Sequence, residues 1–360
     1  MNIVFRLCFF LPLVGIFSLF MCPLSARSEC VVESVPAAVD AFVKHLSQAC
    51  TEQERLAHAI RAEEVLQAIQ LGQEIDLVGV VVVGNLFLDQ LPVVDVPVPE
   101  QLPPLIQELF ASRGVTTLRV ISRSISIRDS RVQGTIATRL KEGYLLLRGP
   151  LTMTGTTCEG MVDLSHTLFS ETVNLSDAAF RREGFFIQTL FNKPAQFERV
   201  AFGAHTRFHR ARFGDMVTFG GAGFNGLAEF LEVVFDKGAN FSRSNFKMGT
   251  GFSGAQFAGH LDFSDVFFER DVYFLFTRFA GDATFRGATF RSQADFSDAE
   301  FDGLSDFSGA SFTADPVFQR TKLAGSPPTR AGGRNLRTLY GIAASLLILT
   351  VLSRWVFRKR

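Results

Sequence analysis

The sequence predicts an all-β chain wound into a solenoid, with an export signal before it and a membrane anchor after it. Three observations predict this organisation. Phenylalanine is in large excess, with 39 Phe against 3 Tyr and 1 Trp. Between Phe197 and Phe318 it recurs at steps that alternate between five and six residues without a break. Long apolar runs stand at both ends of the chain. Repetition of one core residue at a fixed period is typical of repeat proteins, in which each unit packs on the next.

Composition and charge exclude several classes of protein. The 360 residues carry 36 basic and 36 acidic side chains, so the formal net charge is zero. This balance argues against a polybasic nucleic-acid binder and against a strongly acidic nucleic-acid mimic. Hydrophobic residues make up 47% of the chain, which excludes disorder along its whole length.

Residues 1–28 have the pattern of a secretory signal peptide. Arg6 precedes an apolar run over 7–24, and the small residues Ala26 and Ser28 suit cleavage before Glu29. An uncleaved N-terminal membrane anchor is the alternative. Both interpretations predict that the following domain is exported.

Residues 29–74 are predicted to form a helical N-terminal cap. Apolar residues recur at helical spacing, and Gly72 ends the second of two predicted helices. Thr51 and Glu54 have the spacing of a capping box, which places a helix start at Thr51. The apolar positions are Val39, Phe42, Val43 and Leu46 in the first helix, and Leu56, Ile60, Val65, Leu66 and Ile69 in the second.

The cysteines fit an exported domain loosely. Cys30 and Cys50 flank the first predicted helix and are candidates for a disulfide in an oxidising compartment, although two cysteines alone leave the free form open. Their spacing matches no zinc motif, and Cys158 falls at an inward position of the repeat.

Residues 75–146 are predicted to form irregular first coils with a proline-rich excursion. The segment 74–91 is rich in β-branched residues and too short to span a membrane. Five prolines interrupt regular structure over 92–104, and a short helix is expected over 105–112. Residues 116–140 then return to the alternation of a strand.

The regular repeat covers residues 147–323. Extending its register backward from Phe197 predicts nine more core positions, and all nine are apolar. They are Phe191, Phe186, Phe180, Leu175, Phe169, Leu164, Cys158, Met153 and Leu147.

The period of eleven residues excludes a helix and a flat strand. In a helix, a step of five residues turns the side chain by about 140°, so the phenylalanines would not share a face. In a flat strand, an odd step places them on opposite faces. A corner between successive phenylalanines solves both problems, and the six-residue steps carry glycines that we expect to supply the permissive turn conformation. These glycines are Gly203, Gly214, Gly226, Gly238, Gly249, Gly259, Gly281 and Gly303.

The position two before each phenylalanine is also expected to face inward. Alanine and valine fill most of these positions, and their small side chains leave room for stacked rings. The segments Ala239-Asn240-Phe241 and Ala294-Asp295-Phe296 fit the motif A(D/N)LXX with Phe in place of Leu, and Val162-Asp163-Leu164 and Val173-Asn174-Leu175 fit it more loosely. The chain therefore resembles the pentapeptide-repeat family. The resemblance implies a right-handed quadrilateral β-helix, here with 22 residues in each coil, about eight regular coils and a rod length near ~40 Å.

The C-terminal segment is predicted to cross a membrane once. After a linker over 324–335, residues 336–357 form an apolar run long enough for a transmembrane helix, with Tyr340 and Trp355 near its ends. The basic tail 358–360 favours a cytoplasmic C-terminus, which places the repeat domain on the extracytoplasmic (periplasmic) side of the inner or plasma membrane. A buried helix is the alternative, but the run has no polar stripe.

Two surface features are candidate interaction sites. Arg207, His209, Arg210 and Arg212 concentrate positive charge that suits anionic lipid headgroups or cell-wall polymers, unless they only form a solvated face. Phe267, Tyr273 and Phe276 lie off the inward register and form a candidate docking surface, unless they mark a local bulge.

Columns of residues one coil apart are expected to contact one another. Glu229 follows Arg207 by one coil, so these two side chains are expected to pair, and one polar column is expected to form hydrogen bonds between coils. That column contains Gln196, Thr218, Asn240, Asp262, Thr284 and Asp306.

The sequence contains no known catalytic or metal-binding motif. Acidic residues gather near the C-terminal end of the repeat, but their order does not match an EF-hand, and we predict no metal site. No nucleophile elbow, phosphate loop or zinc-protease motif is present, so we predict no enzyme, no catalytic residues and no cofactor. The acids are Asp295, Asp298, Glu300, Asp302, Asp306 and Asp315.

The sequence thus predicts a non-catalytic, membrane-anchored extracytoplasmic rod for binding or scaffolding. A protein or cell-envelope partner is expected, and a homodimer through a β-helix end is left open. The family resemblance also allows a DNA-mimicking topoisomerase regulator, but residues 197–318 carry only 16 acids against 11 bases, and the export signal argues against nucleic acid as a partner. A polysaccharide-binding or polysaccharide-cleaving β-helix is the third alternative.

Overall fold

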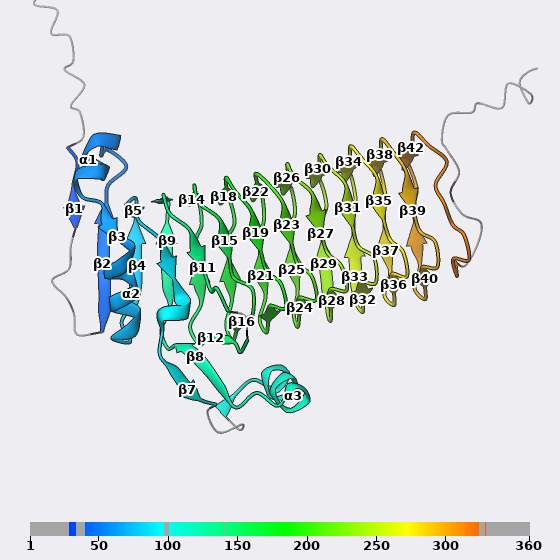
Figure 1. Cartoon of the computed structure of the whole chain (residues 1–360). Coiled ribbons are helices and arrows are strands. Elements are labelled where there is room, and N and C mark those ends of the chain that lie inside the picture. The colour runs from blue at the N-terminus through cyan, green and yellow to red at the C-terminus, as the bar shows by residue number, and fades with distance from the viewer. Residues whose placement is uncertain (1–28, 34–39, 97–100, 141, 324–327, 329–360) are drawn as a thin grey trace, which may run out of the picture.

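The chain folds into a four-sided β-helix in the computed structural model, which describes residues 29–33, 40–96, 101–140, 142–323 and 328 (Figure 1). The predicted signal peptide, transmembrane helix and basic tail, and the linker apart from Pro328, lie outside the described residues. Within the described part of the chain, no helix combines the length and the apolar character needed to span a membrane.

Each complete coil contributes one strand to each of four sheets, A to D, in that order. Sheets A and B hold the first and second strands of the coils. Sheet A contains β1 (Val32–Glu33), β2 (Ala41–Leu46), β4 (Glu74–Val78), β9 (Ile125–Arg128), β13 (Leu151–Thr152), β17 (Val173–Asn174), β21 (Ala195–Gln196), β25 (Val217–Thr218), β29 (Gly238–Asn240), β33 (His260–Asp262), β37 (Ala283–Thr284) and β41 (Ser305–Asp306). Sheet B contains β3 (Ile60–Arg61), β5 (Val81–Val83), β10 (Arg131–Val132), β14 (Thr157–Cys158), β18 (Ala179–Phe180), β22 (Ala201–Phe202), β26 (Gly223–Phe224), β30 (Asn245–Phe246), β34 (Phe267–Phe268), β38 (Thr289–Phe290) and β42 (Ser311–Phe312).

The other two sides complete each coil. Sheet C contains β6 (Leu86–Phe87), β11 (Ile136–Ala137), β15 (Val162–Asp163), β19 (Gly184–Phe185), β23 (Thr206–Arg207), β27 (Ala228–Glu229), β31 (Thr250–Gly251), β35 (Val272–Tyr273) and β39 (Ala294–Asp295). Sheet D contains β7 (Val93–Asp95), β8 (Thr117–Ile121), β12 (Leu145–Leu147), β16 (Thr167–Phe169), β20 (Leu190–Phe191), β24 (Arg212–Phe213), β28 (Val234–Phe235), β32 (Gln256–Phe257), β36 (Arg278–Phe279) and β40 (Glu300–Phe301). Four helical segments complete the described fold, namely α1 (Glu52–Ala57), α2 (Ala62–Gln70), the 3₁₀ turn η1 (Leu88–Gln90) and α3 (Pro104–Arg113).

The predicted coil length is confirmed. Neighbouring strands in the regular region pair in parallel at a shift of one predicted coil, as in Ala195 with Val217 and Phe202 with Phe224. Sheet A passes through eight strands from β13 to β41, which matches the eight coils predicted for 147–323. Three earlier rungs of sheet A, β2, β4 and β9, precede them, so the solenoid has about eleven turns.

The phenylalanine ladder forms the core. From Phe197 to Phe318, each ladder residue is buried except Phe307 and Phe318, which are half-buried in the last coil. Rings one coil apart stack face to face, with centroids 4.9 Å apart for Phe230 and Phe252. Rings of sheets A and C meet edge to face across the axis, at 5.6 Å for Phe241 and Phe252. Both geometries are favourable for aromatic pairs.

The corners follow two designs, and the predicted role of the glycines was wrong. In the five-residue steps, the residue two beyond the core position takes a left-handed conformation. The core carbonyl accepts a hydrogen bond from the amide three residues on, as Phe252 O does from Ala255 N at 2.9 Å. The left-handed positions in the regular coils are Gly155, His166, Asp177, Gln188, Arg199, Arg210, Gly221, Glu232, Arg243, Gly254, Asp265, Phe276, Gly287, Asp298, Gly309 and Arg320.

Glycines of the six-residue steps instead allow coils to approach closely. Gly259 and Gly281 do not have a positive φ, so they do not supply the left-handed conformation that we expected. A Cβ atom on Gly281 would overlap the carbonyl group of Gly259 in the preceding coil. The glycine is therefore required because its backbone lies against another backbone.

The N-terminal cap is only partly helical, so the predicted first helix around Phe42 and Leu46 was wrong. Residues 41–46 form strand β2, which pairs in parallel with β4. The open edge of sheet A needs a hydrogen-bonded cover, and this requirement overrides the helical spacing of the side chains. The second predicted helix is present as α1 and α2, and Thr51 and Glu54 form the predicted capping box.

A disulfide and one arginine fasten the cap. The sulfur atoms of Cys30 and Cys50 are bonded at 2.07 Å, which ties β1 to the loop before α1. Arg55 of α1 donates to the carbonyls of Ser47 at 3.0 Å and Gly79, so it joins the cap to the first full coil. The cap closes the N-terminal end of the core, where Val65 and Ile69 of α2 are buried.

The proline-rich excursion packs back on sheet D as a strap. Helix α3 occupies nearly the range predicted for a short helix, and β7 pairs antiparallel with β8. Ile106 and Phe110 of the excursion join a second core with outward-facing leucines of sheet D, which are Leu146, Leu168 and Leu190. The next residue in that column, Arg212, forms an ion pair with Glu108 of α3 at 3.3 Å.

Substitution of Phe252 by Ala is expected to lower the free energy of unfolding by about 3–5 kcal/mol. Phe252 is fully buried and stacks between Phe230 and Phe274, at 4.9 and 5.1 Å. Phe276→Ala is the matched control, because Phe276 is 68% exposed, and it is expected to change stability by about 0.5 kcal/mol or less. Denaturant unfolding of the three proteins measures both effects, and equal losses would contradict the inward ladder.

Candidate interaction surface

The basic cluster predicted around Arg207 is neutralised by acids of the next coil. Arg207 Nε lies 2.8 Å from Glu229 Oε2, as expected from their one-coil separation, and His209 Nε2 lies 3.4 Å from the same oxygen. Arg210 pairs with Glu232 and Arg212 with Asp236, each at 2.8 Å. The cluster is therefore a set of ion pairs that extends from sheet C over the C–D corner to sheet D, not a free positive patch.

Glu229 is the centre of this cluster. Its Oε2 atom also lies 2.6 Å from His205 Nε2. Partial burial opposes ionisation, but hydrogen bonds from Arg207 and His205 hold the pKa of Glu229 below its usual value. Burial lowers the pKa of His209 although the Glu229 carboxylate opposes the shift. The carboxylate therefore stays ionised at neutral pH and compensates the surrounding cations.

The acidic residues near the C-terminal end are likewise paired or used in turns, except the exposed Asp315. Asp298 pairs with Arg320 at 2.6 Å, Asp302 with Arg278 at 2.9 Å and Glu300 with Lys322. In the part of the chain that the structure describes, no group of three or more His, Cys, Asp or Glu residues is arranged to hold a metal ion.

The three aromatic residues predicted to form a docking surface do not form one patch. Phe267 belongs to sheet B and is half-buried, because the guanidinium of Arg291 covers its ring at 5.1 Å. Tyr273 and Phe276 lie on the C side, 39% and 68% exposed, with half-buried Leu275 between them. The predicted docking surface is therefore reduced to Tyr273, Leu275 and Phe276, which we call the C-side aromatic cluster.

Phe276 has an unusual backbone conformation. Its φ is +54°, in the left-handed region that bulky side chains avoid. Every other non-glycine residue with positive φ among the described residues is polar or charged, namely Asp129, Arg139, His166, Asp177, Gln188, Arg199, Arg210, Glu232, Arg243, Asp265, Asp298 and Arg320. The corner thus holds a strained apolar residue and presents it to solvent.

A cleft of about 500 Å³ lies where the end of the strap meets the C–D corner of the first regular coils. Its charged and polar walls include Arg113 at the end of α3, Arg119 of β8 and Glu142. His166 and Gln188 line it from the corner, and both occupy left-handed positions, one coil apart. Sequence reasoning did not single out these residues, because the strap that brings Arg113 to the corner has no periodic signal.

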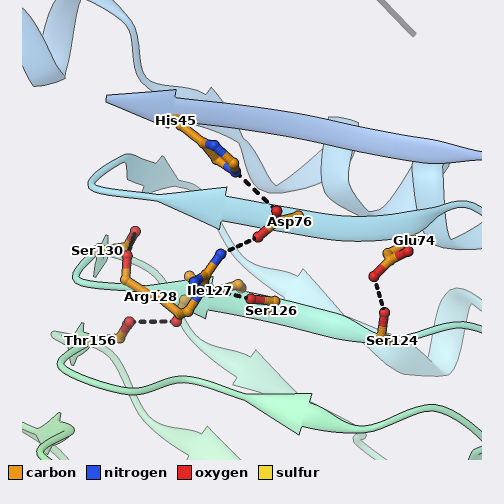
Figure 2. Close-up of polar contacts among 9 residues, drawn as sticks. All are labelled: His45, Glu74, Asp76, Ser124, Ser126, Ile127, Arg128, Ser130 and Thr156. Atoms are coloured by element: carbon orange, nitrogen blue, oxygen red, sulfur yellow. Dashed lines mark hydrogen bonds and ion pairs between the residues drawn. The ribbon is translucent and has the colours of Figure 1, made fainter. Parts of the chain in front are cut away.

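A polar cluster on the outward face of sheet A joins the first three rungs (Figure 2). His45 Nε2 of β2 lies 3.0 Å from Asp76 Oδ2 of β4, and Arg128 Nη2 of β9 lies 2.9 Å from Asp76 Oδ1. Partial burial opposes ionisation, yet hydrogen bonds from Arg128 and His45 lower the pKa of Asp76. The cluster therefore holds the cap strand to the solenoid.

The neighbouring contacts in Figure 2 also join adjacent coils or fix side chains within the cluster. Ser124 Oγ, just before β9, donates to Glu74 Oε1 of β4 at 2.5 Å. Arg128 Nε donates to Ser126 Oγ at 3.0 Å, which fixes the guanidinium beside Asp76. Ser130 and Thr156 donate to the carbonyls of Arg128 and Ile127, both at 2.7 Å. We therefore assign this cluster to stability.

Comparison with known proteins identifies the repeat. A family model described as pentapeptide repeats, with nine copies, matches residues 277–322. The same coil geometry continues back to Leu147 without a change of register. The chain is a pentapeptide-repeat protein. No curated protein and no solved structure matches it significantly.

The Asp or Asn residue of the pentapeptide motif has a local role here. Asn240 Oδ1 accepts a hydrogen bond from the backbone amide of Ser242 at 2.8 Å, and Asp262 accepts from Ser264 at 2.7 Å. Asp306 accepts from Ser308 in the same way at 2.8 Å. We expected hydrogen bonds between coils in this column, but these side chains cap the turn of their own coil. The pentapeptide motif therefore encodes the corner as well as the core.

The charge on Asp306 is expected to make the last coil sensitive to acid. Hydrogen bonds from Ser308, reinforced by Arg286, lower the pKa of Asp306 to about 2. An unfolded Asp titrates near about 3.9, so the stabilisation is complete above that pH and is lost as the pH falls towards 2. Asp306→Asn keeps an acceptor oxygen but removes the titration, and its melting temperature should fall less over this window than that of the unmodified protein.

Thermal unfolding of the purified full-length chain between about pH 5 and about pH 2 measures this difference. Asp315→Asn is the control, because it removes one exposed carboxylate of the same end without removing a turn cap. Equal pH slopes for Asp306→Asn and the unmodified protein would contradict the assignment.

Proposed function

We propose that this pentapeptide-repeat protein is a non-catalytic, extracytoplasmic binding rod, tethered to the membrane by residues 336–357. Export by residues 1–28 would place the solenoid outside the cytoplasm, and the single C-terminal span would hold it at the membrane surface. Its partner is a protein of the cell envelope that docks on the C-side aromatic cluster.

The observation that carries this proposal is Phe276. A left-handed conformation costs a non-glycine residue about 1–2 kcal/mol, and an exposed phenyl ring gains nothing from burial. Strain of this kind persists where it is part of a function. Because other coils place Gly or a polar side chain at the corresponding corner, the fold itself does not require phenylalanine there.

The surroundings of Phe276 favour an apolar partner surface. Gly251 lies beside Tyr273 in the preceding coil and Gly254 precedes Phe276 by one coil, so neither of these two neighbouring positions has a side chain to cover the rings. Burial of the exposed area of Tyr273, Leu275 and Phe276 would stabilise a complex at roughly 25 cal/mol per Å². Aromatic residues of this type are the usual anchors of protein interfaces.

The charge distribution does not favour the nucleic-acid alternative. A DNA mimic needs carboxylates that remain free along the rod, whereas Glu229, Glu232 and Asp298 are engaged by arginines. Because these ion pairs cancel opposite charges, they leave little negative electrostatic potential that could imitate DNA.

The proposed topology predicts the behaviour of reporter fusions. A reporter that is active only in the cytoplasm is expected to be active after Arg360 and inactive when inserted at residue 330, because the span separates the two positions. A second reporter that is active only outside the cytoplasm should give the opposite pattern. The reverse result for both reporters would reject the membrane topology.

The proposed docking surface predicts site-specific crosslinking in cells. A photoreactive phenylalanine analogue at position 276 is expected to form a discrete adduct with one envelope protein. The same analogue at Thr284, which lies on sheet A, is the control and should form no such adduct. Phe276→Ser should abolish recovery of that partner without a loss of the rod. An adduct of equal yield at positions 276 and 284, or no adduct at position 276, would contradict the proposal.

A further inference from the structure

We infer that the cleft between the strap and the C–D corner binds a small hydroxylated carboxylic acid. This ligand site is separate from the C-side aromatic cluster. Its volume of about 500 Å³ lies within the range of small-molecule sites, which is roughly 300–1,000 Å³. Its walls come from Val93 of β7, from residues 113–119 and 142–144, and from the corner residues His166 and Gln188.

The charged groups of the cleft favour one negative charge on the ligand. Arg113 and Arg119 face a single acid, Glu142. Asp89, whose carbonyl accepts from Arg119, does not compensate this excess, because its carboxylate pairs with Arg139 at 3.2 Å. One positive charge therefore remains for a carboxylate, which a guanidinium binds through paired hydrogen bonds.

Each of the two guanidiniums makes one hydrogen bond to the protein and keeps further N–H donors for a ligand. Arg113 Nη1 donates to Gln188 Oε1 at 3.0 Å, and Arg119 Nε donates to the carbonyl of Asp89 at 3.1 Å. The remaining N–H groups of each arginine have no hydrogen-bond partner among the described residues. Fixed side chains with free donors lower the entropic cost of binding.

The neutral groups favour hydroxyls on the same ligand. Thr116 and Thr117 supply two exposed hydroxyls, and Glu142 supplies a carboxylate acceptor. Burial lowers the pKa of His166, although a hydrogen bond to the backbone of Gly143 opposes the shift. At neutral pH the imidazole is therefore neutral, its one N–H is engaged by Gly143, and its other ring nitrogen is an acceptor. A bare anion such as phosphate would meet the arginines but would leave these groups, and above all Glu142, without a matching partner.

The floor of the cleft is rigid. The Tyr144 ring is buried between Phe110 of α3 and His166, with centroid distances of 6.3 and 5.8 Å. Phe110 in turn packs with Leu118 and Leu168 in the second core. The packing that fastens the strap therefore also fixes the position of the polar walls, as a binding site requires.

Isothermal titration calorimetry of the full-length protein tests the site with D-glucuronate as the probe. D-glucose lacks the carboxylate, acetate lacks the hydroxyls, and inorganic phosphate is a bare anion. We expect saturable binding of glucuronate and binding at least about tenfold weaker for each of the other three. Arg113→Gln removes one guanidinium and should weaken glucuronate binding by about tenfold or more.

Arg182→Gln is the matched control, because it removes an exposed arginine away from the cleft and should leave binding unchanged. Absence of saturable binding, equal binding of glucose or phosphate, or unchanged affinity in Arg113→Gln would overturn the inference. None of these outcomes affects docking at Phe276.

Discussion

Stacking of phenylalanine rings between successive coils is the interaction on which the rest of the structure depends. Rings one coil apart stack at spacings such as 4.7 Å for Phe219 and Phe241, which is also the separation of hydrogen-bonded strands. The aromatic columns and the four backbone ladders therefore share one repeat. An insertion within a side would break both at once.

This constraint also organises the surface. Because each outward residue lies above another one coil away, charges of opposite sign meet without any loop to position them, as in Asp177 and Arg199 at 2.7 Å. Each exposed pair stabilises the fold only slightly. Together these pairs cancel opposite charges along the sides of the rod. Apolar exposure, as at Phe276, and the charge of the cleft are the features that distinguish one position from another.

Periodicity predicted the interior well and the ends poorly. The ladder, the eight regular coils and the capping box follow from spacing alone, because each depends on local residues or on a strict repeat. The strand at 41–46 does not, since the open edge of β4 decides its conformation. The turn-capping role of Asn240 and the close approach at Gly281 also escaped prediction, because both depend on backbone geometry at corners that sequence spacing does not describe. The arginines of the cleft escaped for a related reason, since an aperiodic excursion brings them together.

Sites with a potential function lie where the repeat is interrupted or violated. The outward leucines of sheet D form a column that would be exposed on a regular rod, and the strap covers them. Covering them brings Arg113 beside Gln188, which creates a cleft that the β-helix alone does not have. At Phe276 the backbone repeat is intact, but the side chain breaks the rule that left-handed corners are glycine or polar. A regular solenoid offers the same surface in every coil, and these departures give individual positions on it a distinct identity.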